Sequence, residues 1–140
     1  MYSFFAAGVP QPKGSTKSFR HRHTGKIVTM QNNNDKLRSW ELIVQLEAQK
    51  YIKSKMTAVI VYMQFVLPRP KIHYRSNGEV KERFFNLPHV VKPDGDKLAR
   101  AVLDALTKAG VYNDDANVVG HSVWKQYGEK PGVLIRISEA

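Results

Sequence analysis

The sequence predicts a single α+β domain over residues 1–140, with a small mixed β-sheet and two main helices. Hydrophobic residues recur at intervals of three and four in residues 34–51 and 96–108, which is the helical period. Apolar or alternating runs at 2–9, 57–67, 117–127 and 132–138 are typical of strands. The length suits one compact domain.

The N-terminal third is predicted to contain a strand, a basic segment and a helix. The first strand, residues 2–9, stops at two prolines. Residues 13–26 carry only basic charges and a Thr24-Gly25 turn signal, so a basic hairpin and a solvated loop both fit them. The helix begins at Asn34 or Asp35 as N-cap and runs for about five turns. Its Trp40 and Tyr51 are expected to be core anchors.

The rest of the chain alternates between buried and exposed segments. Residues 57–67 are apolar on both faces, which predicts a strand in the middle of the sheet. Residues 69–89 are irregular, with Asn77-Gly78 as the turn signal. The second helix ends at Gly110, and the last two strands are expected to form a closing hairpin.

The composition predicts a polyanionic partner. There are 22 Lys and Arg against 12 Asp and Glu, a net charge of +10, which favours nucleic acid over a membrane. Cysteine is absent, which excludes disulfides and thiolate metal sites. No apolar run approaches the roughly 20 residues that span a bilayer, so we expect a soluble, cytoplasmic protein that does not engage membranes.

Two basic segments are the candidate DNA contacts. The loop at 69–89 interleaves cations with aromatic residues, which suits phosphate binding and base stacking, although a mobile surface hairpin is the alternative. The predicted contacts are Lys13, Lys17, Arg20, Arg22 and Lys26 in the first segment, Arg69, Lys71, Arg75, Lys81 and Arg83 in the loop, and Lys97.

The aspartates are concentrated in one short window. Five of the six, at positions 94, 96, 104, 114 and 115, lie within 22 residues whose net charge is 3 − 5 = −2, in a chain of +10. Carboxylates beside DNA phosphates repel them unless a divalent cation lies between, so this pattern indicates metal-dependent phosphodiester chemistry. Oxygen ligands without thiolates favour Mg²⁺, with Mn²⁺ also possible.

Each aspartate also has a purely structural interpretation. Asp94 and Asp96 flank Gly95 at a helix start, where carboxylates commonly cap free N–H groups. Asp114 and Asp115 precede a strand, where such pairs commonly form a turn. Asp104, on the polar helix face, is left out of the site because a basic neighbour can pair with it. His21 and His23 are interpreted as surface or phosphate contacts rather than metal ligands.

The run Lys92-Pro93-Asp94-Gly95-Asp96, the helix end Asp104-Ala105-Leu106-Thr107-Lys108-Ala109-Gly110 and the segment Asp114-Asp115-Ala116-Asn117-Val118-Val119 resemble the RusA family of Holliday-junction resolvases. The resemblance covers about a third of the chain. Before residue 90 it extends only to size, basicity and element order. It implies a RusA-like fold, a homodimer, and Mg²⁺ held by Asp94, Asp96 and Asp115.

A lysine four residues after the second aspartate also matters in that family. This chain has Arg100 there and carries Lys97 where asparagine is common. Arginine can clamp a phosphate or stabilise the transition state but does not readily give up a proton, so either residue could take that role.

The resemblance implies a crossover junction endodeoxyribonuclease that cuts four-way DNA in pairs, with Asp94, Asp96, Asp115 and Arg100 as catalytic residues. A non-catalytic nucleic-acid-binding domain and a nuclease for flaps or forks remain alternatives. A basic protein that binds an acidic protein is a weaker one, because it does not explain the aspartates.

Overall fold

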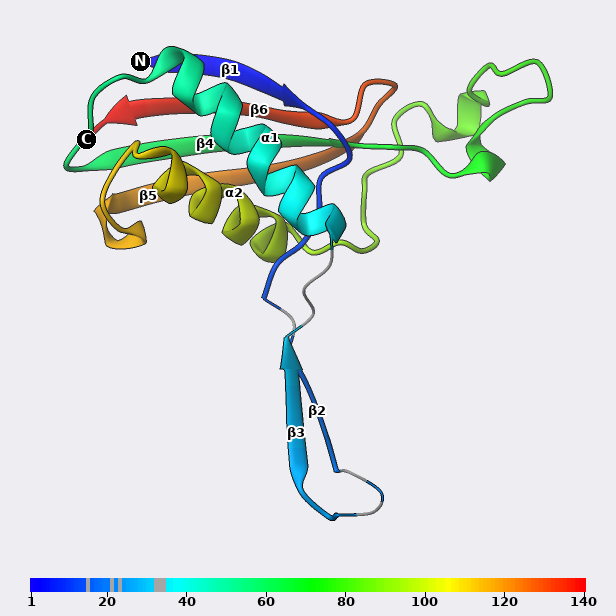
Figure 1. Ribbon diagram of the computed structural model, residues 1–140. Coiled ribbons are helices and arrows are strands. Elements are labelled where there is room, and N and C mark those ends of the chain that lie inside the picture. Colours follow the sequence, from blue (N-terminus) through cyan, green and yellow to red (C-terminus); the bar gives the residue numbers. More distant parts are fainter. Residues whose placement is uncertain (15, 21, 23, 32–34) are drawn as a thin grey trace.

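Four strands form the main sheet, in the order β1, β6, β4, β5 (Figure 1). Their bounds are β1 Tyr2–Ala7, β4 Val59–Leu67, β5 Val118–Tyr127 and β6 Gly132–Glu139. The pair β4 and β5 is parallel and the other two pairs are antiparallel, so the sheet is mixed, as the sequence predicted. This computed structural model describes residues 1–14, 16–20, 22, 24–31 and 35–140, with the backbone alone for 16–20 and 27–31.

Strand β4 lies between β5 and β6, in the middle of the sheet as predicted. Its odd-numbered side chains, among them Met63 and Phe65, face the helices and are fully buried. The apolar pattern suggests that little of β4 meets water, and this was wrong for the even-numbered face: the described helices do not cover it, and Ile60 on it is 46% exposed. The sequence is apolar on both faces, but helices cover only one.

The predicted closing hairpin was also wrong. The last two strands, β5 and β6, do not pair with each other, because β4 lies between them. A helix connects β4 to β5, and such crossovers return the chain in parallel. The short connection after Tyr127 then crosses the end of β4, where the Gly128 N–H donates to the Leu67 carbonyl at 3.0 Å.

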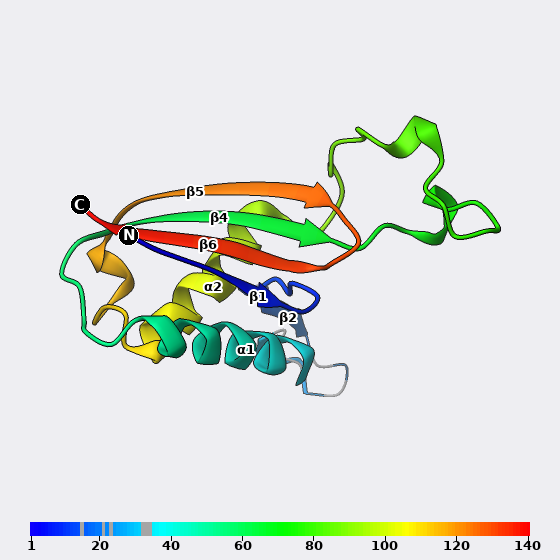
Figure 2. The ribbon, with the colours of Figure 1, turned by 90° about the horizontal axis from the view of Figure 1, so that it is seen from above.

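Two helices, α1 (Asp35–Tyr51) and α2 (Gly95–Ala109), cover one face of the sheet and pack on each other (Figure 2). Trp40 is 2% exposed and anchors the core as predicted. Tyr51 is 52% exposed, so it is not the core anchor that was expected; it stacks on Phe4 at the helix end. Gly110 ends α2 with a positive φ of 82°, a conformation that glycine adopts without strain. The alternative N-cap of α1, Asn34, lies outside the described residues.

Two segments project from the end of the molecule where α2 begins (Figure 1). One is the hairpin of β2 (Thr16–Arg20) and β3 (Ile27–Gln31), which decides for a hairpin over a loop in the basic segment. The other is the loop after β4, which contains two short 3₁₀ helices, Lys71–His73 and Glu82–Phe84. None of the helices in the described part of the chain is long and apolar enough to cross a membrane.

Candidate active site

The carboxylates of Asp94 and Asp96 stand at the start of α2. Asp94 is the N-cap residue by its backbone, yet its side chain accepts no capping hydrogen bond, and its carbonyl receives the Leu98 N–H at 3.1 Å. The Asp94 side chain is 53% exposed, and Asp96, in the first turn of the helix, is exposed as well. Capping therefore does not use the Asp94 carboxylate, and its exposure makes it accessible to an external cation.

Two lysines set the position of this helix start. The Lys125 ammonium on β5 donates to the carbonyls of Val91 and Pro93, at 2.9 and 3.0 Å, and so ties the segment before Asp94 to the sheet. Lys97 lies 3.8 Å from the Asp94 carboxylate. Lys125 could not be found from the sequence, since no local motif links it to residues more than thirty positions earlier.

Asp115 lies at the opposite end of α2. Its Oδ1 accepts a hydrogen bond from the Thr107 hydroxyl at 2.8 Å. Thr107 follows Asp96 by eleven residues, and a helix rises 1.5 Å per residue, so roughly 16 Å separates the two ends. Among the residues that the structure describes, no three acidic or histidine side chains are close enough to share an ion. The expectation that Asp94, Asp96 and Asp115 of one chain converge is therefore not met.

The other aspartates of the window have structural partners. Asp114 caps the short 3₁₀ helix Asp115–Asn117 in a capping box with Asn117. For Asp114 this agrees with the purely structural interpretation, in which the aspartate pair forms a turn. Asp104 pairs with Lys13 at 2.7 Å. The acidic window of the sequence is thus divided in space: Asp94 and Asp96 are exposed at the start of α2, and Asp114 and Asp115 are exposed beyond its other end.

Arg100 lies one turn after Asp96 on the same exposed side of α2. Its guanidinium sits against Gly14, the residue that precedes the basic hairpin, so closely that a Cβ at Gly14 would overlap it. Gly14 also has a positive φ of 106°. Arg100 therefore lies between the Asp96 end of the helix and the root of the hairpin.

Lys13 belongs to a buried ion network rather than to a free basic surface. Its ammonium contacts Asp104 and also Glu41, at 3.3 Å, and Glu41 has only 8% of its side chain exposed. Lys108 reaches the same Glu41 carboxylate at 3.2 Å. Burial lowers the pKa of Lys13, but the two carboxylates outweigh it and the net shift is upward. The expectation that Lys13 contacts DNA stays a prediction, and in this structure its charge is already paired with Asp104 and Glu41.

The hairpin root also touches the start of α2 directly. The Lys13 N–H donates to the Lys97 carbonyl at 3.0 Å. The start of α2 therefore lies between the root of the basic hairpin and the segment that returns from the loop (Figure 1).

The family model of endodeoxyribonuclease RusA matches residues 8–138 of the chain, including the hairpin and the long loop. The chain belongs to the RusA endodeoxyribonuclease family. The match confirms the resemblance seen in residues 92–119 and the nuclease class that it implied. It also shows that the similarity begins as early as residue 8. A search of curated proteins gave no significant match.

In this RusA family member the long loop is built around a small aromatic cluster. The buried His73 stacks on Phe84, with ring centroids 4.2 Å apart, and meets Tyr127 edge-on. Arg69 donates to the Phe84 carbonyl at 2.7 Å and lies over the Tyr127 ring. Burial, with the charges of Arg69 and Lys81, lowers the pKa of His73. The order of this loop argues against a structureless surface segment.

The basic residues of the two projections divide into engaged and available groups. Arg69 is engaged inside the loop, and its expected DNA contact stays a prediction. Lys71, Arg75 and Arg83 are exposed and Lys81 is half-buried. Arg22 and Lys26 are exposed at the hairpin end, the side chains of Lys17 and Arg20 are not described, and His21 and His23 lie outside the described residues.

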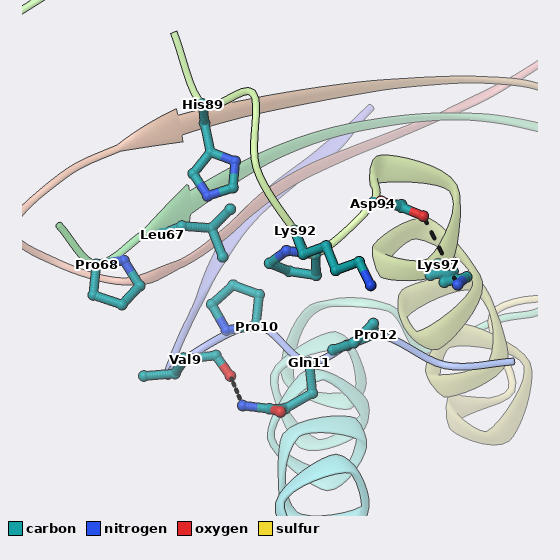
Figure 3. A pocket seen from close by; sticks show the side chains of 11 residues that line it. Val9, Pro10, Gln11, Pro12, Leu67, Pro68, His89, Lys92, Asp94 and Lys97 are labelled. Carbon is teal, nitrogen blue, oxygen red and sulfur yellow. Dashed lines mark hydrogen bonds and ion pairs between the residues drawn. The ribbon is translucent and has the colours of Figure 1, made fainter. Parts of the chain in front are cut away.

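A pocket of about 510 Å³ opens directly beside Asp94 (Figure 3). Three segments line it: the strap that follows β1, the end of β4, and the segment from His89 to Lys97. His89 is 8% exposed, and its Nδ1 has no hydrogen-bond partner in the part of the chain that the structure describes. His89 and Gln11 could not be found from the sequence, because only the tertiary fold brings them to Asp94.

Proposed function

We propose that this RusA family member is a Mg²⁺-dependent endonuclease that resolves four-way DNA junctions by paired phosphodiester cleavage. The observation that carries the proposal is the pair Asp94 and Asp96, two exposed carboxylates on a strongly basic chain, of which Asp94 stands at the N-cap without capping the helix. Asp94 and Asp96 place two exposed negative charges at one helix start, and a cation between them and a DNA phosphate would join all three.

The donor set fits Mg²⁺. This ion is commonly held by one or two carboxylates, with water and substrate phosphate oxygens completing its shell, so Asp94 and Asp96 suffice as the protein ligands. When bound, Mg²⁺ would lower the pKa of an attacking water and neutralise charge on the leaving oxygen; Mn²⁺ can take the same place.

The chain's own side chains supply the rest of the site. Arg100, one turn after Asp96, is positioned to stabilise negative charge on the phosphate under attack, and its planar fork suits two phosphate oxygens. Lys125 holds the segment before Asp94 by two carbonyls and so fixes where that carboxylate stands. The exposed cations of the hairpin and the loop would bind the junction arms through phosphates, reading shape more than sequence.

Paired cleavage of two strands requires two sites, which a two-fold homodimer supplies. The sheet face without helices supports such a partner, because Phe5 and Trp124 lie in one cross-strand row on it and are 39% and 60% exposed. If Asp115 serves the ion at Asp94 and Asp96, it must come from the second copy, since α2 separates these residues within one chain.

The test compares a synthetic four-way junction, a flap and a linear duplex, each with Mg²⁺ and with chelator. We expect paired, metal-dependent nicks in the junction by the wild-type protein. Asp96→Asn should abolish cleavage and keep or tighten junction binding, because it removes a negative charge beside DNA.

Two outcomes would contradict the proposal. If Asp96→Asn cleaves the junction at the wild-type rate in Mg²⁺, Asp96 does not belong to the active site. Binding without metal-dependent nicking of any substrate would favour a non-catalytic DNA-binding domain, and preferred cutting of the flap would favour a nuclease for other branched DNA.

A further inference from the structure

We propose that the pocket beside Asp94 binds one unstacked nucleobase of the DNA strand that is cut. The inference rests on the proposed nuclease function and adds a ligand to it: a single base next to the scissile phosphate. The position of the pocket is the first support. Asp94 is part of its wall, so a strand whose phosphate lies at Asp94 and Asp96 has its neighbouring nucleotide at the pocket mouth.

The size and the walls of the pocket suit a flat apolar ring. About 510 Å³ falls within the roughly 300–1,000 Å³ of ordinary small-molecule sites. Six of the lining residues are apolar, and four of these are prolines. They are Val9, Pro10, Pro12, Leu67, Pro68 and Pro93. The faces of a nucleobase are apolar and its edges are polar, so such a wall would pack on a face.

Hydrogen-bonding groups stand where an edge of the base would come. In Figure 3 the His89 ring points from its loop toward Leu67 and Pro10. Its Nδ1 is buried and has no partner in the described structure. Buried polar atoms are rarely left unpaired, so this nitrogen needs a partner that the described residues do not supply. Gln11 donates its amide N–H to the Val9 carbonyl at 3.2 Å, which leaves the amide oxygen as an acceptor.

Two lysine side chains line the part of the pocket beside Asp94. Lys92 and Lys97 both belong to the lining, and the Lys92 side chain extends along the pocket toward Asp94 and Lys97 (Figure 3). A nucleotide presents an apolar face, a polar edge and a phosphate together, and the pocket offers an apolar wall, His89 with Gln11, and two ammonium groups. A purely apolar ligand would leave the lysines unused, and a free anion would leave the wall unused.

Unstacking costs least at a branch point. A base at a strand exchange lacks a continuous stack on one side, and the cost of extruding a base is lowest where stacking or pairing is already disturbed. A pocket of this kind would make cleavage at a junction depend on which nucleotide occupies it, without any contact to paired bases in a groove.

The experiment uses junctions with 2-aminopurine at single positions around the cut phosphate, bound to the Asp96→Asn protein so that no strand is cut. This base analogue becomes brighter when it leaves the stack. None of the described lining residues is Phe, Tyr or Trp, so the analogue would not be quenched in the pocket. We expect a severalfold rise in 2-aminopurine fluorescence on binding at one position. The rise should disappear when Gln11→Trp is added and persist when Gln49→Trp is added, a control of similar exposure on α1.

A second measurement needs no change in the protein. Replacing the nucleotide at that position by an abasic site should slow single-turnover cleavage by the wild-type enzyme by up to about 100-fold, because the scissile phosphate loses its alignment. In Gln11→Trp the abasic site should make no further difference.

The outcomes separate the inference from the proposed function. If the wild-type protein cuts junctions but every 2-aminopurine position stays dark and the abasic junction is cut at the normal rate, the pocket proposal is overturned and the nuclease proposal stands. A rise that survives Gln11→Trp would mean that the junction itself opens the base, which also overturns it. If no junction is cut in Mg²⁺, the nuclease proposal fails first.

Discussion

The buried carboxylate of Glu41 gives the prediction that is most directly tied to the geometry. It accepts hydrogen bonds from Lys13 and Lys108, whose side chains are 21% and 57% exposed. Through Lys13 it fastens the strap that leads to the basic hairpin onto α1. We consider Glu41→Gln, which keeps the shape and one acceptor but removes the charge.

The expected loss can be worked from these contacts. A hydrogen bond to a charged group contributes about 1.5–3 kcal/mol, and the half-exposed Lys108 pair adds about 0–1 kcal/mol. A neutral hydrogen bond retained by the amide returns about 1 kcal/mol, so the free energy of unfolding should fall by about 2 kcal/mol. At about 2.1 cal/mol/K per residue, a 140-residue chain then loses about 7 °C in Tm.

The matched control is Glu47→Gln on the same helix. Glu47 pairs with Lys50 at 2.8 Å, but the Lys50 side chain is 62% exposed and the two residues are neighbours on the helix surface. Solvent screens such a pair, so Tm should fall by less than about 2 °C. Thermal melts by circular dichroism and urea titration measure both variants. Equal, small shifts would refute the argument that burial of Glu41 makes its ion network stabilising.

Two further predictions concern the assembly and the DNA surface. If Asp115 acts across a dimer, Asp96→Asn and Asp115→Asn should each be inactive alone. Co-refolded mixtures of the two variants should regain single-strand nicking, because a mixed dimer contains one intact composite site. Mixtures that stay inactive would exclude a composite site. Reversing charge at Lys81 and Arg83 should weaken junction binding and reduce the slope of log K against log salt by about 0.9 for each phosphate that the loop no longer neutralises. Lys53→Glu at the far end of α1 is the control for net charge, and equal slopes in all variants would make the loop a bystander.

Local periodicity was enough to predict α2 and its motif. Leu98, Val102 and Leu106 repeat at helical spacing and are buried, and Gly110 ends the helix where the sequence placed its stop. The motif Asp94-Gly95-Asp96 could be recognised because its residues are adjacent in the chain. These features depend on hydrogen bonds and side-chain packing within a few residues, so the sequence by itself determined them.

The pairing of strands and the distances between distant residues were decided only by the tertiary structure. One helix holds Asp115 and Asp96 apart, since a straight helix of this length is a rigid spacer between its ends. Lys13 became an ion-pair partner because α1 and α2 bring Glu41 and Asp104 to it across many residues. The pocket of His89 and Gln11 likewise joins three segments remote in the chain. Such long-range contacts arise from how the apolar faces pack together, and residue spacing alone does not encode them.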